Sequence, residues 1–178
     1  MTLVARRARG PRAVWPVLAG AAQAAAIAMP GGGQAHGWLQ VLSLTVLATA
    51  LAHMARTPHP SRATLKSAAW TGGLFAVTWL AGCFWWLYVS MHDVGGLPAP
   101  LAVLAVLALA SALSLYYAAA CAAWVGLARG ALQHRPVWLS VVFAALWTLA
   151  ELMRGRWLTG FPWGAGGYAH VDGVLAVW

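Results

Sequence analysis

The feature that most constrains this chain is a set of five long apolar segments that contain no lysine or arginine. They cover residues 13–29, 37–55, 67–90, 99–128 and 137–153, and Glu151 is their only carboxylate. Each is long enough for an α-helix to cross the ~30 Å hydrocarbon core of a membrane. The runs are continuous and rich in Ala and Leu instead of alternating with a period of two, which argues against transmembrane strands. We therefore expect an all-α fold, a polytopic transmembrane helix bundle with five spans.

The composition agrees that lipid is the solvent of this bundle. Of the 178 residues, 62% are hydrophobic and only 8% are charged, and the mean hydropathy is +0.72. A soluble chain of this size could not bury so much apolar side chain. Connections rich in Gly, Pro, His and Arg separate the segments, at 30–37, 55–62, 93–100 and 129–136. The expected organisation is a helix bundle over residues 1–153, followed by an interfacial loop over residues 154–178.

The positions of the basic residues predict the orientation of the bundle, because Lys and Arg in short loops resist translocation. The basic residues before residue 154 either precede the first span or lie in the connections after the second and fourth spans. They are Arg6, Arg7, Arg9, Arg12, Arg56, Arg62, Lys66, Arg129 and Arg135. The N-terminus is therefore predicted to be cytoplasmic and residues 154–178 extracytoplasmic. The same placement explains the net charge of +8 by topology and by contact with anionic lipid headgroups, and argues against nucleic acid as a partner.

The first segment leaves one alternative open. The run "RRARGPR" followed by "AVWPVLAGAAQAA" resembles a signal peptide with a small-residue cleavage site. Pro16 and Gln23 make a poor apolar core for such a peptide, and four further spans follow. These observations favour an uncleaved first helix.

Tryptophan placement supports the limits of the spans. The expected cytoplasmic ends carry Trp15, Trp70 and Trp138, and the opposite ends carry Trp38, Trp85, Trp86, Trp157 and Trp163. Such belts are typical of membrane interfaces. Three others fall away from the ends and are expected to pack between helices: Trp79, Trp124 and Trp147.

The spans carry few groups that could perform covalent chemistry. Cys83 and Cys121 lie inside predicted spans, where a thiol behaves as a small hydrophobe. The six histidines form no metal-ligand spacing and are expected to be solvated near the interfaces. The sequence predicts neither a metal site nor a cofactor.

The most unusual segment follows the fifth span. Residues 155–168, "GRWLTGFPWGAGGY", are too apolar for an ordinary solvated loop and too rich in glycine for a helix. Just before them, Glu151 and Arg154 lie one helical turn apart and can pair on the same face. We consider two interpretations, a structural ion pair at the interface or a polar anchor that fixes the following loop or a lipid headgroup.

This segment carries a resemblance to a known family. Residues 151–173, "ELMRGRWLTGFPWGAGGYAHVDG", resemble the stretch that follows the fifth transmembrane helix in apolipoprotein N-acyltransferases, approximately E-x-x-R-G-x-x-x-T-G-F-P-W-x-x-x-G-Y-x-x-x-D-G. The matching residues are Glu151, Arg154, Gly155, Thr159, Gly160, Phe161, Pro162, Trp163, Gly167, Tyr168, Asp172 and Gly173. Residues 85–104, "WWLYVSMHDVGGLPAPLAVL", are similar to the family's join between the third and fourth helices.

The resemblance implies a function in the bacterial inner membrane. Enzymes of this family move an acyl chain from a phospholipid to an enzyme cysteine as a thioester, and then to the α-amine of the N-terminal cysteine of a diacylglyceryl-modified lipoprotein. Their catalytic Glu, Lys and Cys belong to an extracytoplasmic nitrilase-like α/β domain inserted after the sixth helix. In this chain, the resemblance implies a lipid-facing or structural loop built from Glu151, Arg154, Gly160, Phe161, Pro162, Trp163 and Tyr168, with Trp85 and Tyr88 nearby.

The sequence departs from the family at its end. It stops at Trp178, before the sixth helix and the nitrilase-like domain, and neither Cys83 nor Cys121 matches the catalytic cysteine. We therefore expect a fragment or one piece of a split protein that does not transfer acyl groups alone. Two other functions stay open: a noncatalytic membrane scaffold that recruits a separate catalytic domain, and a small transporter subunit, which would require more polar groups within the spans.

Overall fold

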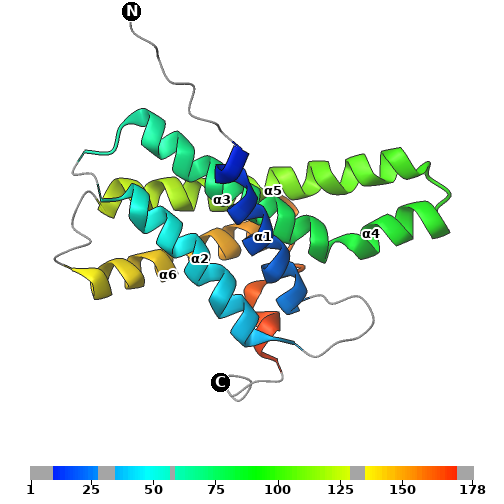
Figure 1. Cartoon of the computed structure of the whole chain (residues 1–178). Helices are drawn as coiled ribbons and strands as arrows, with labels where there is room; N and C mark the ends of the chain where they lie inside the picture. Colours follow the sequence, from blue (N-terminus) through cyan, green and yellow to red (C-terminus); the bar gives the residue numbers. More distant parts are fainter. Residues whose placement is uncertain (1–9, 28–34, 57–58, 129–134, 172–178) are drawn as a thin grey trace, which may run out of the picture.

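The computed structural model describes residues 10–27, 35–56, 59–128 and 135–171, and every regular element in these ranges is helical (Figure 1). The elements are α1 (Gly10–Ile27), α2 (Gly37–Met54), α3 (Arg62–Cys83), α4 (Trp85–Val89), the π-helix η1 (Ser90–Val94), α5 (Ala99–Ala128), α6 (Pro136–Arg156) and the 3-10 helices η3 (Trp157–Thr159) and η4 (Gly166–His170). The all-α class is therefore confirmed. Several predicted features lie outside the described residues, namely Arg6, Arg7, Arg9, Arg129 and the tail 172–178.

Three of the described helices are long and apolar enough to cross a membrane, namely α2, α5 and α6. A fourth span is obtained if α3 and the α4–η1 segment count as one span that is bent by 52°. The apolar part of α1, Val14–Ile27, is shorter than the others. The chain is thus a multi-helix membrane protein, and the count of five spans remains a prediction.

The structure differs from the prediction in the third apolar segment, which is broken into two helices. A continuous helix was expected over residues 67–90, but α3 begins at Arg62 and breaks at Phe84. Ser61 caps the helix start, because its hydroxyl oxygen accepts a hydrogen bond from the Thr64 amide at 3.2 Å. Phe84 adopts φ −95° and ψ 12°, outside the helical region, and the chain resumes in a new direction as α4. No proline lies at this break, and Gly82, two residues before Phe84, is one of several glycines within the apolar segments, so local sequence rules give only a weak signal for it.

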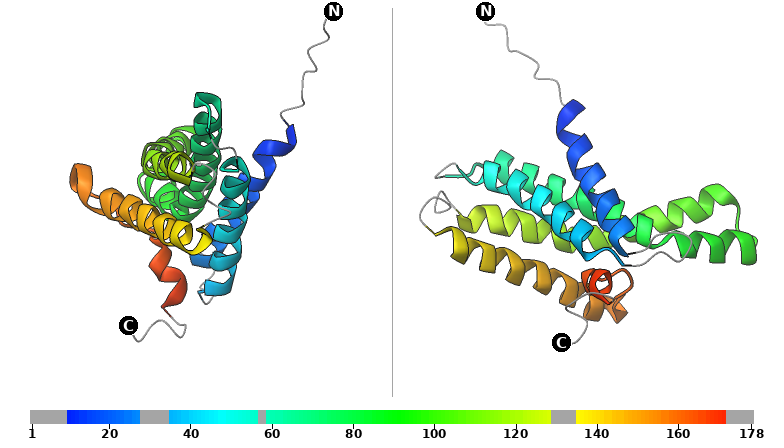
Figure 2. Two further views of the ribbon diagram at one scale, coloured as in Figure 1. Left: turned by 90° about the vertical axis from the view of Figure 1, so that its left-hand side faces the viewer. Right: turned by 60° about the horizontal axis from the view of Figure 1, so that its bottom comes forward.

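The bundle is organised around α3, which lies along α5 on one side and against α1 on the other. Helix α1 also packs on α2, and α6 packs on α5. Figure 1 and the right-hand view of Figure 2 show that α4, η1 and the beginning of α5 form a hairpin that projects beyond the remaining helices. With 30 residues, α5 is about 45 Å long, which exceeds the ~30 Å hydrocarbon core.

Aromatic rings fill the centre of the bundle. The Trp79 ring of α3 contacts the Tyr117 ring of α5 at a centroid distance of 5.1 Å and stacks on the Trp147 ring of α6 at 5.9 Å. Trp124 is also buried, and its indole donates a hydrogen bond to the Leu139 carbonyl at 2.8 Å. The expectation that Trp79, Trp124 and Trp147 pack between helices is confirmed. The tryptophans expected at the interfaces all have exposed side chains: Trp15, Trp38, Trp70, Trp85, Trp86, Trp138, Trp157 and Trp163.

Candidate functional site

The candidate site is the aromatic loop, which we define as residues 157–170. It leaves the end of α6, passes through η3 and a glycine-rich turn, and ends in η4 beside the beginning of α2. Figure 2 shows it, in orange to red, folded back against the bundle at the end where α6 stops. The predicted loop is therefore a compact structure with two short helices, and Arg154 belongs to the last turn of α6.

Arg154 is the anchor of the first half of this loop. Its side chain is only 1% exposed. The Nε–H donates to the Tyr117 hydroxyl at 3.0 Å, and Nη1 donates to the carbonyl oxygens of Phe161 at 2.7 Å and Trp163 at 2.8 Å. One guanidinium thus joins α6 to α5 and to both sides of Pro162. The planar fork of arginine is suited to several fixed acceptors at once.

The expected ion pair between Glu151 and Arg154 does not form within the described residues. Glu151 is partly buried and its Oε1 instead accepts a hydrogen bond from the Gly166 amide at 3.1 Å. The two side chains sit one helical turn apart, but each is directed to a different half of the loop. The second interpretation, a polar anchor that fixes the loop, therefore describes both residues better than a simple ion pair.

The turn at Gly160 bends the chain back toward α6. Gly160 has φ +72°, and a Cβ at this position would strike the Gly155 carbonyl oxygen. The Gly160 amide donates to the Trp157 carbonyl at 2.8 Å, and the Phe161 amide donates to the Arg154 carbonyl at 2.9 Å. The positive φ explains the requirement for glycine here. Leu158 also has a positive φ of 52° and is 91% exposed.

The rings of the loop meet the α4 region in two contacts. Phe161 packs edge-on against Phe84 at a centroid distance of 5.1 Å, and Trp163 lies 5.6 Å from Trp86. Both contacts come from residues at the break between α3 and α4. Trp163 remains 54% exposed and Tyr168 46% exposed. Pro162, which precedes Trp163 in the chain, is exposed as well.

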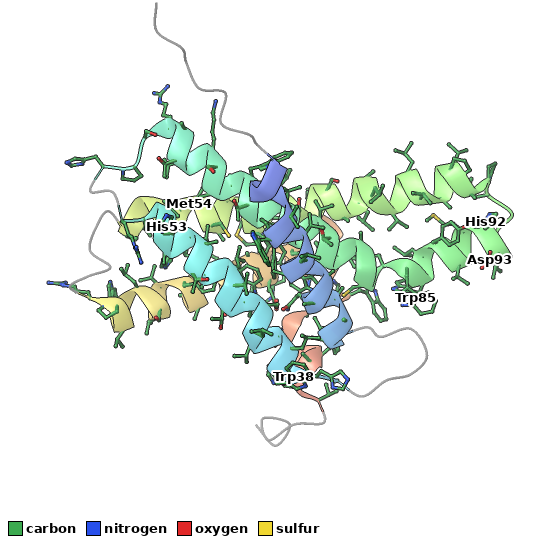
Figure 3. All side chains as sticks on the ribbon, in the orientation of Figure 1. Trp38, His53, Met54, Trp85, His92 and Asp93 are labelled. Carbon is green, nitrogen blue, oxygen red and sulfur yellow. The ribbon has the colours of Figure 1, made fainter. Side chains whose placement is uncertain are left out.

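Trp85 and Tyr88 were expected to accompany the loop; among the described aromatic rings, neither is paired with a ring of the loop, and their part in the site remains a prediction. Trp85 is exposed on the side of α4, as Figure 3 shows, and Tyr88 lies against His92 at 5.2 Å. Their neighbours Phe84 and Trp86 make the contacts instead. Helical periodicity could not identify them, because the break at Phe84 changes which face of the helix is turned toward the loop.

The second half of the loop rests on α2, which sequence reasoning did not include in the site. The side-chain amide of Gln40 donates to the Gly166 carbonyl at 2.9 Å. A Cβ placed on Gly37 would lie 2.6 Å from Nδ1 of His170, so η4 packs directly on the start of α2. A polar residue in the first turn of an apolar span, Gln40, was the signal in the sequence that could have pointed to this contact.

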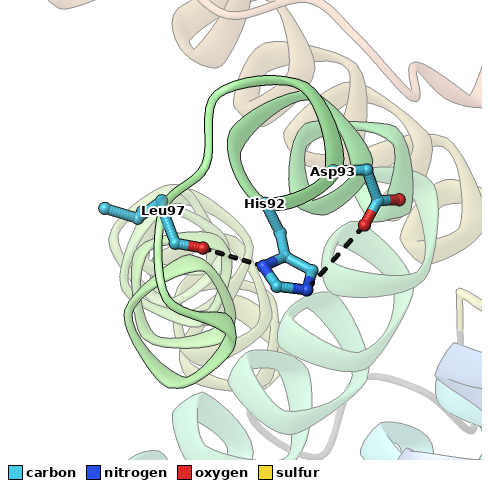
Figure 4. A network of polar contacts seen from close by, with 3 residues as sticks. All are labelled: His92, Asp93 and Leu97. Carbon is cyan, nitrogen blue, oxygen red and sulfur yellow. Dashed lines mark hydrogen bonds and ion pairs between the residues drawn. The ribbon is translucent and has the colours of Figure 1, made fainter.

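The tip of the α4–η1 hairpin is closed by His92 (Figure 4). Its Nδ1 lies 2.8 Å from the Leu97 carbonyl oxygen and its Nε2 lies 3.8 Å from Oδ1 of Asp93. Because a carbonyl can only accept, Nδ1 carries the proton. His92 was expected to be merely solvated, but it fastens the end of η1 to the segment that leads into α5.

The described residues of this site offer hydrogen-bonding groups and exposed aromatic rings. Cys83 and Cys121 are free and buried. In the part of the chain that the structure describes, no group of three His, Cys, Asp or Glu side chains could hold a metal ion. The loop presents exposed aromatic rings on a backbone that buried polar side chains hold in place, which suits contact with lipid.

Comparison with known proteins gives one consistent result. Residues 14–178 match the family model described as apolipoprotein N-acyltransferase N-terminal domain. The chain is 51% identical over 164 residues to an apolipoprotein N-acyltransferase of Verminephrobacter eiseniae. The matched residues make up 92% of this chain and 29% of that protein. Similar enzymes of Ralstonia nicotianae and Pseudomonas putida are 43% and 36% identical, each over 78% of this chain and 25% of its relative. The chain thus spans between a quarter and a third of the length of these relatives.

Proposed function

Because this chain belongs to the apolipoprotein N-acyltransferase family and matches its N-terminal domain, we propose that it is the membrane portion of an enzyme that acylates bacterial lipoproteins. The donor is a phospholipid and the acceptor is the N-terminal cysteine amine of a diacylglyceryl-modified lipoprotein. The covalent step through a thioester belongs to the family's nitrilase-like domain, and no residue assigned here performs it. The contribution of this portion is to admit and orient lipid.

The observation that supports this proposal best is the construction of the aromatic loop. Arg154 fixes the carbonyls on both sides of Pro162, while the Trp163 and Tyr168 rings remain exposed. The buried side of the loop backbone is fixed by Arg154, and its exposed side carries apolar rings. Such a surface is suited to hold an acyl chain or glyceryl group in one position. Non-helical backbone is tolerated near a membrane where protein groups satisfy its polar atoms, and Arg154, Glu151 and Gln40 do so here.

The proposal includes a location and an orientation. The protein resides in the inner membrane with five spans and a cytoplasmic N-terminus, so the aromatic loop lies at the extracytoplasmic interface. This orientation brings the loop to the face on which the lipoprotein is acylated. It follows from the Arg and Lys residues in the connections predicted to be cytoplasmic, of which Arg56, Arg62, Lys66 and Arg135 are exposed near the ends of α2, α3 and α6.

A chimera tests the proposal. In the Verminephrobacter eiseniae enzyme, the matching N-terminal 29% would be replaced by this chain, and acyl transfer would be measured in vesicles with a fluorescent phospholipid donor. We expect the chimera to be active and Trp163→Ala to lower kcat/KM at least tenfold. Trp70→Ala is the matched control, because Trp70 is also exposed but lies on α3 away from the loop.

The alternatives give different results in the same assay. Turnover by Trp163→Ala equal to that of the unsubstituted chimera would reduce the loop to an interfacial anchor. The scaffold alternative requires that this chain, expressed alone, captures a separately expressed catalytic domain and restores its activity. The unsubstituted chimera distinguishes a general failure of folding from loss of the loop's function.

A further inference from the structure

We propose that Gln40 is a positioning residue for the lipid-binding surface of the aromatic loop, and that it acts from outside the loop as one arm of a clamp on the backbone of a single residue, Gly166. The inference rests on the proposed function, since it concerns the same loop. It adds α2 to the site, a helix that carries none of the residues of the family motif. The clamp consists of Gln40, Gly166 and Glu151.

The two arms of the clamp hold opposite ends of the same residue. The Gly166 amide donates to Oε1 of Glu151 on α6 at 3.1 Å, and the Gly166 carbonyl accepts from Nε2 of Gln40 on α2 at 2.9 Å. Because the carbonyl can only accept, the Gln40 side chain must present its NH2 group. Both backbone groups of a buried glycine are thus satisfied by side chains from two different helices.

Sterics show that the clamp is closed tightly. A Cβ on Gly166 would lie 2.7 Å from Nε2 of Gln40 and 3.0 Å from Oε1 of Glu151, so any larger residue would displace the ends of these two side chains from their hydrogen-bonded positions. Gln40 itself is 5% exposed, and its NH2 group would have to find another partner in an apolar span if Gly166 moved away. The clamp therefore has one position in which both backbone groups of Gly166 are paired with these two side chains.

The clamp governs a part of the loop that Arg154 does not reach. Arg154 binds the carbonyls of Phe161 and Trp163, whereas Gly166 begins η4, which carries Tyr168. Without Gln40, the Glu151 bond and the packing of η4 on α1 and on the start of α2 would remain to hold this second half. The relative placement of the exposed rings of Trp163 and Tyr168 then depends on α2 as well as on α6.

Hydrogen exchange on the whole chain in phosphatidylethanolamine nanodiscs tests the clamp itself. Gln40→Met keeps the length of the side chain and removes the donor, and we expect exchange over residues 164–170 to rise about tenfold. Exchange in residues 157–163 and within α2 should stay unchanged, which a general loss of stability would not produce. Gln23→Met is the matched control, because Gln23 is also buried in an apolar helix but bonds Ser43 and not the loop.

Two substitutions of Glu151 keep the test decisive if Gln40→Met alone fails to fold. Glu151→Gln retains an oxygen that accepts from Gly166 and should preserve slow exchange, whereas Glu151→Leu should raise exchange over the same residues as Gln40→Met does. Unchanged exchange in both Gln40→Met and Glu151→Leu would overturn the clamp. So would equal increases across α2, α6 and the loop.

The chimera described above separates this inference from the proposed function. We expect Gln40→Met to raise the KM for the phospholipid about tenfold with a smaller effect on kcat, and Gln23→Met to leave both unchanged. If Gln40→Met has no kinetic effect while Trp163→Ala abolishes transfer, the positioning role is overturned and the function of the loop stands. If Trp163→Ala has no effect either, the loop is only an interfacial anchor and the lipid-holding role proposed for it fails; an inactive unsubstituted chimera would instead contradict the proposed function of the whole chain.

Discussion

Arg154 shows how a single buried cation can organise a loop without a carboxylate partner. Its guanidinium is surrounded by the Tyr117 hydroxyl and two backbone carbonyls. Desolvating a charge is costly, and these dipoles compensate only as long as all of them stay in place. The charge therefore makes the local structure specific, because any displacement of the loop leaves a buried cation with fewer acceptors.

Replacing Arg154 tests this interpretation at the residue scale. Arg154→Met leaves three oxygen acceptors without their donor, and we expect a loss on the order of 3 kcal/mol in the free energy of unfolding. Arg154→Lys should recover little of it, since an ammonium lacks the planar fork. Chemical unfolding in detergent, followed by near-ultraviolet circular dichroism of the tryptophans, measures the effect.

The control for that measurement is two residues away. Arg156 ends the same helix and is exposed, so Arg156→Met should change the free energy of unfolding by less than about 0.5 kcal/mol. Equal losses for the two arginines would mean that net charge matters and not the hydrogen bonds of Arg154.

Gly160 and Gly167 form a second matched pair. Gly160→Ala forces a side chain into φ +72° and against the Gly155 carbonyl, and we expect a cost of at least about 2 kcal/mol with disordering of the turn. A Cβ on Gly167 meets no atom within 4 Å, so Gly167→Ala should be nearly neutral. Limited proteolysis after residue 156 would report the difference, and a resistant Gly160→Ala protein would contradict it.

For individual residues, the amino-acid sequence predicts which positions belong to the loop motif, but it does not predict which residues they contact. The spacing of the motif is sufficient to identify Arg154, Gly160 and Trp163. Tyr117 and Gln40 were not predicted, because they bond residues 37 and 126 positions away along the chain. No local periodicity encodes contacts at such separations.

Among the elements, the break between α3 and α4 has the largest consequence for the site. It turns the helix by 52° and puts Phe84 and Trp86 against the loop rings. The limits of the other helices lie within about three residues of the apolar segments, because lipid selects continuous apolar runs and polar connections end them. The bend was missed because Gly82, two residues before it, resembles other glycines within the apolar segments, while the packing of Phe84 against Phe161 cannot be read from local sequence.

His92 provides a test of how the hairpin is closed. His92→Ala removes the hydrogen bond to the Leu97 carbonyl, which we expect to contribute about 1 kcal/mol to the stability of the turn. Hydrogen exchange at Gly95 and Leu97 should rise about fivefold, with α3 unaffected. His53→Ala on α2 is the control, since His53 is exposed far from this hairpin, as Figure 3 shows. Unchanged exchange would mean that η1 alone holds the turn.

For the whole molecule, the predicted orientation can be measured with cysteine labelling. The native Cys83 and Cys121 are buried, so a membrane-impermeant maleimide should not label the unsubstituted protein. Asp93→Cys should react in intact spheroplasts, whereas Arg62→Cys should react only after permeabilisation. The reverse pattern would invert the bundle and move the aromatic loop to the cytoplasmic face.

The length of α5 adds a dependence that no single residue carries. The helix is about 15 Å longer than the hydrocarbon core is thick. Exposed apolar side chains near its beginning, such as Leu101 and Leu104, are therefore surrounded by lipid or by water depending on the thickness of the membrane. Through the Phe84–Phe161 and Trp86–Trp163 contacts, the same hairpin is joined to the aromatic loop. Hydrophobic mismatch between protein and bilayer would therefore shift the depth of the loop, so the acyl-chain length of the host membrane becomes a determinant of the geometry of the site.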